Sequence, residues 1–316
     1  MKIFSTLPET PALHRFQNEV YERLSSERLM VVLTVVPVLL LLTFVLVLPI
    51  LWAIWSSFHR IPLYQPQWTW IGVEHYVTQI ASPMFRASLW KSVIFAVGSV
   101  AIQLTAGIGI ALIINRDFKF NKGVRAIVLL PYLIPTALLG FLALWMFNTN
   151  WGILNSILVR AGLIDVGIQW FGNPDTAMLL LMVATAWKYA IFATILVLAR
   201  LQSIPDGYYD AARVAGASRW QKFRDITLPN LKGVIFIVVL LRGIWMFNKY
   251  DIIAVMTNGG PGDATQTAPI YAYKLAFNSY NLGESAAVSV ILFVILIGAA
   301  LIYFRVLEPE SEVRTE

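Results

Sequence analysis

The chain has 316 residues, of which 58% are hydrophobic and 13% are charged, with a net charge of +6. An ordinary soluble domain carries a charge on roughly a quarter of its residues, so this composition excludes a typical soluble protein. The lack of cysteine excludes disulfides and thiolate chemistry, and three scattered histidines form no visible metal-ligand cluster. We therefore expect an all-α membrane protein that binds no metal or other cofactor of its own.

The N-terminal segment, 1–28, is too polar before the first apolar run to be a secretory signal. Apolar residues recur at helical spacing between His14 and Arg28, which predicts an amphipathic helix lying along the cytoplasmic membrane surface. An ordinary solvated helix fits the same spacing.

Six apolar stretches follow, each long enough to cross a bilayer, which takes about 20 helical residues. Pro131 and Pro135 predict a kink in the third stretch. Pro229 is expected to stop regular structure just before the fifth. Together the spans make one membrane domain, 29–304, which is followed by a tail, 305–316. The expected spans are 29–58, 89–115, 123–147, 176–200, 233–256 and 284–304.

Lysine and arginine fall unevenly on alternate loops. The rich set comprises the N-terminus, the tail and two loops, 116–122 and 201–232, whereas the other set holds only Arg60, Arg86, Lys91, Arg160 and Lys274. Loops rich in cations stay in the cytoplasm. We therefore expect both termini to be cytoplasmic.

The long cytoplasmic loop, 201–232, has the pattern of a helix–turn–helix. Pro205 suits the first turn of a helix, Gly216 suits a left-handed turn that ends it, and Ser218 is placed to cap a second short helix that runs to about Phe223. Loops this long are usually functional, so the pattern favours a docking site for another protein. A plain connector between two spans is the alternative.

Several charges fall inside the expected spans, where exposure to lipid costs about 2.5–3.5 kcal/mol each. Lys188 lies midway along the fourth span and Arg242 near the middle of the fifth. Lys249 is expected on nearly the same helical face as Arg242, with Asn248 and Asp251 one turn apart on another face. Asp251 is a candidate counter-ion of Lys188 or of Lys249.

These charges either line a transport pathway or form a structural network that holds the helices together. A sugar site needs aromatic faces and a few directed hydrogen bonds. Two cations on one helical face are also compatible with an anionic solute such as glycerol phosphate. The candidate pathway residues are Trp187, Lys188, Arg242, Trp245, Asn248, Lys249 and Asp251.

The chain lacks the GxxxxGK[ST] loop that binds ATP phosphates, so it is not expected to be an ATPase, and any ATP must be hydrolysed by a partner. A membrane enzyme would need a catalytic carboxylate pair or histidine cluster, and neither is apparent. An ion-coupled secondary transporter would need an internal inverted repeat, and no convincing repeat is found.

The loop at 201–232 resembles the EAA loop of bacterial ABC-importer permeases. The matching residues are Asp210-Ala211-Ala212, Gly216, Ile226, Leu228 and Pro229, with Asp210 in place of the usual glutamate. Other segments resemble permeases of the maltose and glycerol-phosphate type, namely 129–148, the G-x-x-N-x-x-L pattern of Gly152, Asn155 and Leu158, the Trp187-Lys188 pair, 242–251 and 257–265. Asn258 and Lys249 differ from the residues that are frequent at these positions in such permeases.

The resemblance implies a six-helix permease that forms one half of the pore of an ATP-driven importer for a sugar or polyol, working by alternating access. It implies three kinds of partner besides the lipid bilayer, and no nucleic acid: a second homologous permease, two ATP-binding cassette subunits that carry ATP and Mg, and an extracytoplasmic solute-binding protein. The location implied is the inner membrane of a bacterium or archaeon. The residues expected to couple to the ATPase are Asp210, Ala211, Ala212, Arg213, Gly216, Arg219, Leu228 and Pro229.

Overall fold

A computed structural model describes residues 27–62, 67–116, 119 and 121–307 of the chain. The amphipathic helix expected within 1–28 and the tail at 305–316 lie almost entirely outside these residues. The chain divides into two compact units, one ending at Ser56 and the other beginning at Ser57.

The described part of the first unit is one long apolar helix that corresponds to the first expected span. It comprises α2 (Glu27–Leu42), a π-helical turn η1 (Thr43–Val47) and α3 (Leu48–Ser57). Its large apolar side chains are exposed, including Leu40 and Phe44, as expected for a helix surrounded by lipid.

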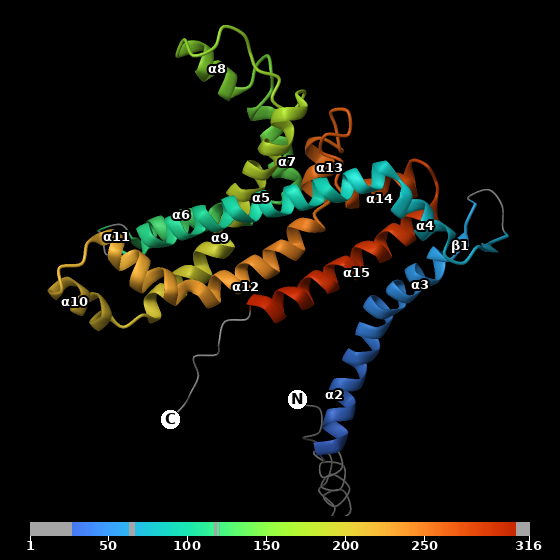
Figure 1. The fold of residues 1–316 in the computed structure, drawn as a ribbon, viewed down its shortest axis with the longest axis horizontal. Coiled ribbons are helices and arrows are strands. Elements are labelled where there is room, and N and C mark those ends of the chain that lie inside the picture. Colours follow the sequence, from blue (N-terminus) through green and yellow to red (C-terminus); the bar gives the residue numbers. More distant parts are fainter. Residues whose placement is uncertain (1–26, 63–66, 117–118, 120, 308–316) are drawn as a thin grey trace, which may run out of the picture. The chain divides into compact units, whose positions relative to one another are not determined.

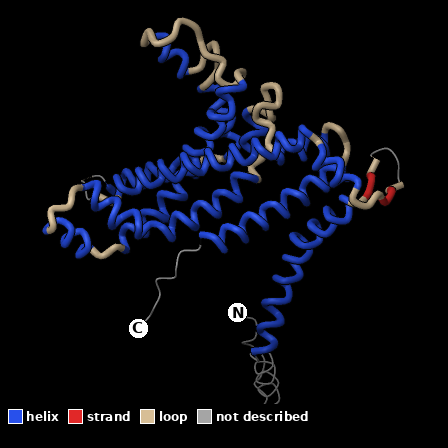
Figure 2. The backbone as a smooth tube through the Cα atoms, in the orientation of Figure 1, coloured by secondary structure: helices blue, strands red, loops and turns tan. Residues whose placement is uncertain are grey.

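The second unit is also mainly helical (Figures 1 and 2). It opens with a short antiparallel hairpin of β1 (His59–Arg60) and β2 (Thr69–Trp70), a small departure from the all-α expectation. The helices that follow are α4 (Glu74–Ala81), α5 (Pro83–Ile114), α6 (Asn121–Leu133), α7 (Thr136–Met146), α8 (Ile153–Arg160), α9 (Pro174–Ser203), α10 (Asp206–Val214), α11 (Arg219–Lys222), the π-turn η2 (Phe223–Thr227), α12 (Leu228–Phe247), α13 (Asp251–Met256), α14 (Ala268–Phe277) and α15 (Leu282–Leu307).

The pairing of α5 with α9 is the most extensive contact of the second unit, and α12 packs against both helices. Small and polar residues on one face of α5 are buried, among them Ser99 and Gly107. A Cβ atom at Gly107 would lie 2.6 Å from the Cβ of Ala193 and 3.0 Å from the carbonyl oxygen of Ala190. Small residues thus allow the two backbones to approach closely, which is how membrane helices commonly associate.

The third expected span consists of two helices, not one kinked helix. Helices α6 and α7 are bent by 95° at the break between them, where Pro135 is the N-cap residue of α7. Proline has no N–H to donate and disfavours helical geometry in the residue before it, here Ile134. Among the described residues, five helices are long and apolar enough to cross a membrane, and the count reaches six if the bent pair is one span.

The fifth expected span is wrong at both ends. Helix α12 ends at Phe247, and α13 is a separate helix that begins at Asp251, so Asn248, Lys249 and Asp251 do not share helical faces as predicted. Asn248, which directly follows Phe247, has a low helix propensity, and the side chain of Lys249 makes contacts with Tyr189 and Asp251 that favour ending the helix here.

At the start of the fifth expected span, one helical segment runs without interruption from Arg219 through Pro229. Pro229 therefore does not stop regular structure as predicted. The π-turn η2 explains this, because the N–H of Leu228 bonds five residues back to the oxygen of Phe223. The wider turn relieves the clash between a proline ring and the carbonyl four residues earlier. The same arrangement precedes Pro49, where the N–H of Leu48 bonds to the oxygen of Thr43.

Close packing of α5 on α9 predicts that Gly107→Val will destabilise the fold. Overpacking of this kind costs about 1–3 kcal/mol, so we expect thermal unfolding in detergent to begin several degrees lower than in the wild type. Gly109→Val is the matched control, because no atom lies within 4 Å of a Cβ built at Gly109. Equal melting temperatures for the two variants would contradict the packing described here.

Candidate functional site

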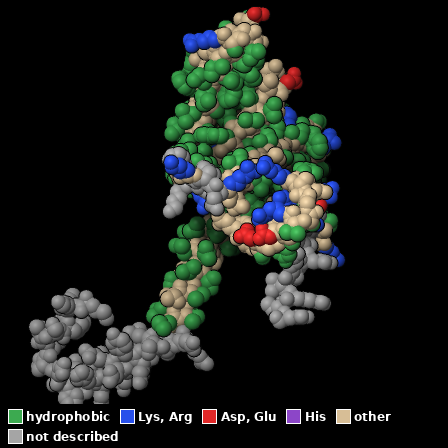
Figure 3. Space-filling model, turned by 90° about the vertical axis from the view of Figure 1, so that its left-hand side faces the viewer, with side chains coloured by type: hydrophobic (Ala, Val, Ile, Leu, Met, Phe, Trp, Pro, Cys, Tyr) green, Lys and Arg blue, Asp and Glu red, His purple; other side chains and the backbone are tan. Residues whose placement is uncertain are grey.

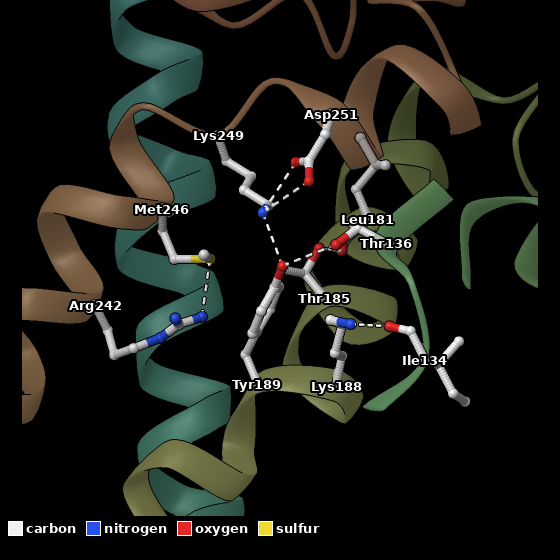
Figure 4. A network of polar contacts seen from close by, with 10 residues as sticks. All are labelled: Ile134, Thr136, Leu181, Thr185, Lys188, Tyr189, Arg242, Met246, Lys249 and Asp251. Atoms are coloured by element: carbon white, nitrogen blue, oxygen red, sulfur yellow. Dashed lines mark hydrogen bonds and ion pairs between the residues drawn. The ribbon is translucent and has the colours of Figure 1, made fainter. Parts of the chain in front are cut away.

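Three cationic side chains surround the ring of Tyr189, a residue of α9 (Figure 4). The guanidinium carbon of Arg242 lies 4.4 Å from the ring centroid, and the Nζ atoms of Lys249 and Lys188 lie 4.8 Å and 5.6 Å away. Lys188 and Arg242 are only 5% and 3% exposed. The electron-rich faces of aromatic rings attract cations, most strongly where water is excluded, so Tyr189 helps to make these buried charges tolerable.

The Tyr189 hydroxyl group connects α9 to two other segments. It accepts a hydrogen bond from Nζ of Lys249 at 2.8 Å and lies 3.3 Å from the hydroxyl oxygen of Thr136 at the start of α7. Nζ of Lys249 also lies 2.9 Å from a carboxylate oxygen of Asp251. Of the two counter-ion pairings considered from the sequence, the structure therefore shows the pairing of Asp251 with Lys249.

Lys188 instead donates to backbone carbonyl groups at the break between α6 and α7. Its acceptors are the oxygens of Ile134 and, at 3.4 Å, of Tyr132. Carbonyls at the end of a helix have no N–H partner within it, and a cation placed there is favourable. Lys188 therefore both satisfies its own buried charge and stabilises the sharp bend.

Arg242 belongs to α12, and its side chain contacts residues of both α5 and α9. Its Nε atom donates to Oε1 of Gln103 at 2.8 Å, and Nη2 lies 3.7 Å from the sulfur of Met246. Gln103 is fully buried, and its Nε2 atom has no hydrogen-bond partner in the part of the chain that the structure describes. Among the same residues, Arg242 forms no ion pair with a carboxylate, so the cluster keeps a net positive charge.

The other expected pathway residues are placed less uniformly. Trp245 joins the cluster, because the guanidinium carbon of Arg242 lies 5.4 Å from its ring, and it is 47% exposed. Trp187 and Asn248 are exposed and make none of the contacts described around Tyr189. Sequence reasoning missed Tyr189 and Gln103, although Tyr189 follows Lys188 directly in the chain.

A second candidate site is the helix–turn–helix made by α10 and α11, which we call the knob (residues 205–227). The turn has the predicted form, since Gly216 has a φ of +75°. Its N–H bonds to the oxygen of Arg213 at 3.0 Å, and the N–H of Ala217 bonds to the oxygen of Ala212 at 2.9 Å. This pair of bonds defines a Schellman motif, in which glycine avoids the strain of a left-handed backbone.

The rest of the knob is held by side-chain contacts. Ser218 and Gln221 form a reciprocal capping box at the start of α11, with bonds of 2.7 Å and 3.2 Å. The hydroxyl groups of Tyr209 and Thr227 lie 3.0 Å apart and tie α10 to η2. Pro205 is the N-cap residue of α10, one position before the helical turn expected for it.

The residues expected to couple to an ATPase lie on or beside this knob. Asp210 and Arg213 form an exposed ion pair on α10, and Ala211, Arg219, Leu228 and Pro229 are also exposed, with Ala212 half-exposed. A rigid turn that presents small side chains and charges to solvent is suited to docking. No group of three His, Asp or Glu side chains that could hold a metal ion occurs within the described part of the chain.

A third feature explains the G-x-x-N pattern of Gly152 and Asn155. The buried amide of Asn155 donates to the oxygens of Thr149 and Ile168, at 3.0 Å and 2.9 Å, and its own oxygen accepts from Nε1 of Trp170 at 2.9 Å. One side chain thus organises the segment on both sides of α8. Gly152 is required nearby, because a Cβ there would lie 2.4 Å from the oxygen of Asn148.

Comparison with known proteins agrees with these features. Residues 103–310 match the family described as the binding-protein-dependent transport system inner membrane component. The chain belongs to this family. The resemblance seen in the knob sequence is thereby confirmed, and the chain is a permease subunit of the binding-protein-dependent type.

Two relatives show how much of the chain this permease family accounts for. The chain is 35% identical to the trehalose/maltose transport system permease protein MalF of Thermococcus litoralis, over 87% of this chain and 92% of that protein. It is 32% identical to the sulfoquinovosyl glycerol transport system permease protein SmoG of Agrobacterium fabrum, over 90% of this chain and 92% of the relative.

A solved structure shows the same fold. A chain of a bacterial ABC transporter involved in the import of the acidic polysaccharide alginate superimposes with a TM-score of 0.76 at 23% identity, covering 91% of this chain and 99% of that one. The permease architecture is therefore shared along nearly the whole of both chains.

The contacts of Asn155 predict that Asn155→Asp will loosen residues 148–170. A carboxylate cannot donate to the two carbonyls, and a lost buried hydrogen bond with an unpaired acceptor costs about 1–3 kcal/mol. We expect hydrogen–deuterium exchange of this segment to become several-fold faster. Asn150→Asp, at an exposed position, is the control with the same charge change, and similar exchange in the two variants would contradict the role given to Asn155.

Proposed function

We propose that the chain is the permease subunit of an ATP-driven importer that carries a sugar or polyol across the cytoplasmic membrane by alternating access. The observation that supports the solute class most directly is the 35% identity to a trehalose/maltose permease over 87% of the chain. The knob supports ATP hydrolysis by a partner as the energy source, because it offers an exposed, rigid docking element on a chain that has no phosphate-binding loop of its own.

The partners proposed are a second homologous permease, two ATP-binding cassette subunits that hold ATP and Mg, and an extracytoplasmic solute-binding protein. Support comes from an alginate ABC transporter of the same fold, which was solved in complex with an alginate pentasaccharide-bound periplasmic protein. In this proposal both termini and the knob face the cytoplasm, in agreement with the cation-rich loops.

Mechanically, closure of the ATPase pair moves the knobs of the two permeases together and shifts the pore from inward-facing to outward-facing. ATP binding then acts by stabilising one of two pre-existing arrangements. The knob transmits force well because its turn is fixed by Gly216, and because η2 and α12 continue from α11 as one helical segment. Displacement of the knob is therefore carried directly along α12 to Arg242 and the Tyr189 cluster.

The Tyr189 cluster is proposed to border the solute pathway. Trp245 is half-exposed beside Arg242, and Asp251 is exposed beside Lys249, so an aromatic face and hydrogen-bonding groups lie together as a sugar site requires. Lys188 acts in this proposal as the support of the bend between α6 and α7.

Anionic solutes, such as glycerol phosphate, are the second candidate class. The observation that favours them is the excess of cations in the cluster, because among the described residues Asp251 is the one carboxylate that forms an ion pair with Lys188, Arg242 or Lys249. Ion-coupled secondary transport is a third alternative, and it leaves the knob without a function.

Coupling through the knob predicts that Gly216→Ala will impair ATP hydrolysis by the assembled complex. An alanine in the left-handed conformation costs about 1–2 kcal/mol, so the docking turn is populated less and ATPase activity stimulated by the loaded binding protein should fall several-fold. Gly207→Ala, in the adjoining helix α10 and with no atom within 4 Å of the added carbon, should retain full stimulation. Equal activities in the two assembled variants would argue against coupling through this turn.

The two solute classes differ in the effect expected from Lys249→Gln. If the solute is neutral, uptake at saturating binding protein should change by less than about threefold, since an amide still donates to the Tyr189 hydroxyl. If the solute is anionic, loss of a cation in a poorly hydrated site should reduce uptake by about tenfold or more. Lys274→Gln, which removes a cation from the ion pair with Asp263, is the control for general loss of charge.

A further inference from the structure

A cavity of about 570 Å³ lies beside the knob, between the ends of α5 and α9 and the segments α10, α11 and η2. Figure 3 shows Lys and Arg side chains gathered around a hollow on the face that carries α10 and α11. The cavity shares no lining residue with the Tyr189 cluster, and the proposed function gives it no ligand.

The charges that line this cavity are mostly positive. Arg116 reaches it from the end of α5, and Arg219 and Lys222 reach it from α11, whereas Asp206 is the single carboxylate among the lining residues. Arginine and lysine together are the usual ligands of phosphate groups, which they bind through charge-assisted hydrogen bonds. The lining therefore favours an anion, and phosphate in particular.

The lining also has an apolar part, which lies at the ends of the spans, beside the polar residues Asn115, Tyr209 and Thr227. Leu112 lies near the end of α5, and Leu201 and Ile204 lie at the end of α9. Ile113, the neighbour of Leu112, is exposed on the outside of α5. A ligand with an anionic head and an apolar tail would satisfy both parts of the cavity at once.

We propose that this cavity binds the phosphate of an anionic phospholipid head group. The cavity lies where two apolar helices end, which is the level of the head groups for a spanning helix, and basic pockets between spans at this level bind anionic lipids. A soluble phosphate has the same chemistry and is the alternative source. A lipid bound here contacts α10 and α11 from the membrane side, beside the Tyr209–Thr227 contact that ties the knob together.

The inference requires only that the chain spans a membrane, so it can fail without affecting the proposed transport function. The test uses the whole complex, purified in mild detergent from membranes containing both phosphatidylglycerol and phosphatidylcholine. Retained lipids are counted by native mass spectrometry. We expect phosphatidylglycerol to be retained in preference to phosphatidylcholine.

The variant Arg116→Ala with Lys222→Ala should reduce retention of phosphatidylglycerol about tenfold, since each cation near an anionic head group strengthens binding severalfold. It leaves Arg219, a residue of the proposed coupling site, unchanged. The control is Arg224→Ala with Lys232→Ala, which removes the same charge from exposed positions that do not line the cavity. The conservative pair Arg116→Lys with Lys222→Arg should retain the lipid and shows that any loss is not a loss of folding.

Equal retention by the cavity variant and its control would overturn the site. Equal retention of the two lipids by the wild type would do the same. Millimolar inorganic phosphate, added as a competitor, separates the two sources. Displacement of phosphatidylglycerol by phosphate would overturn the membrane source, whereas retention of the lipid at that concentration supports it.

Discussion

The need to satisfy positive charges inside an apolar bundle organises the centre of this protein. Lys188 and Arg242 are almost completely buried, where an unpaired charge is costly. The fold meets this need by different means for each residue. Lys188 binds the free carbonyl groups at the α6–α7 break, and Arg242 is held between Gln103 and the ring of Tyr189. The sharp bend and the buried cation therefore stabilise each other.

Prolines affect the helices of this chain in two different ways. Pro135 marks a break of 95°, whereas Pro49 and Pro229 lie within continuous helical segments, each just after a π-turn. The difference has a consequence for function. A continuous segment from α11 through α12 links the knob mechanically to the region of Arg242, while the break between α6 and α7 allows Tyr132 and Ile134 to present carbonyl groups to Lys188.

Much of this arrangement could be predicted from the sequence. Length and hydropathy located the apolar helices, and local rules for Gly216 and Ser218 predicted the turn and the cap of the knob, because these features depend on neighbours close in the chain. The end of α12 at Phe247 could not be predicted in this way, since it depends on contacts of Lys249 with Tyr189, 60 residues away. The same holds for Gln103, whose partner Arg242 lies 139 residues later, and for the π-turn that carries the helix through Pro229.

The central claim is that ATP hydrolysis on partner subunits drives import through this chain. The most direct measurement is solute uptake into proteoliposomes that contain the complete complex, with ATP and Mg enclosed and the loaded binding protein outside. The account predicts uptake that requires enclosed ATP and persists when ionophores abolish all ion gradients. Uptake that proceeds without ATP and stops when the ion gradients are abolished would contradict it.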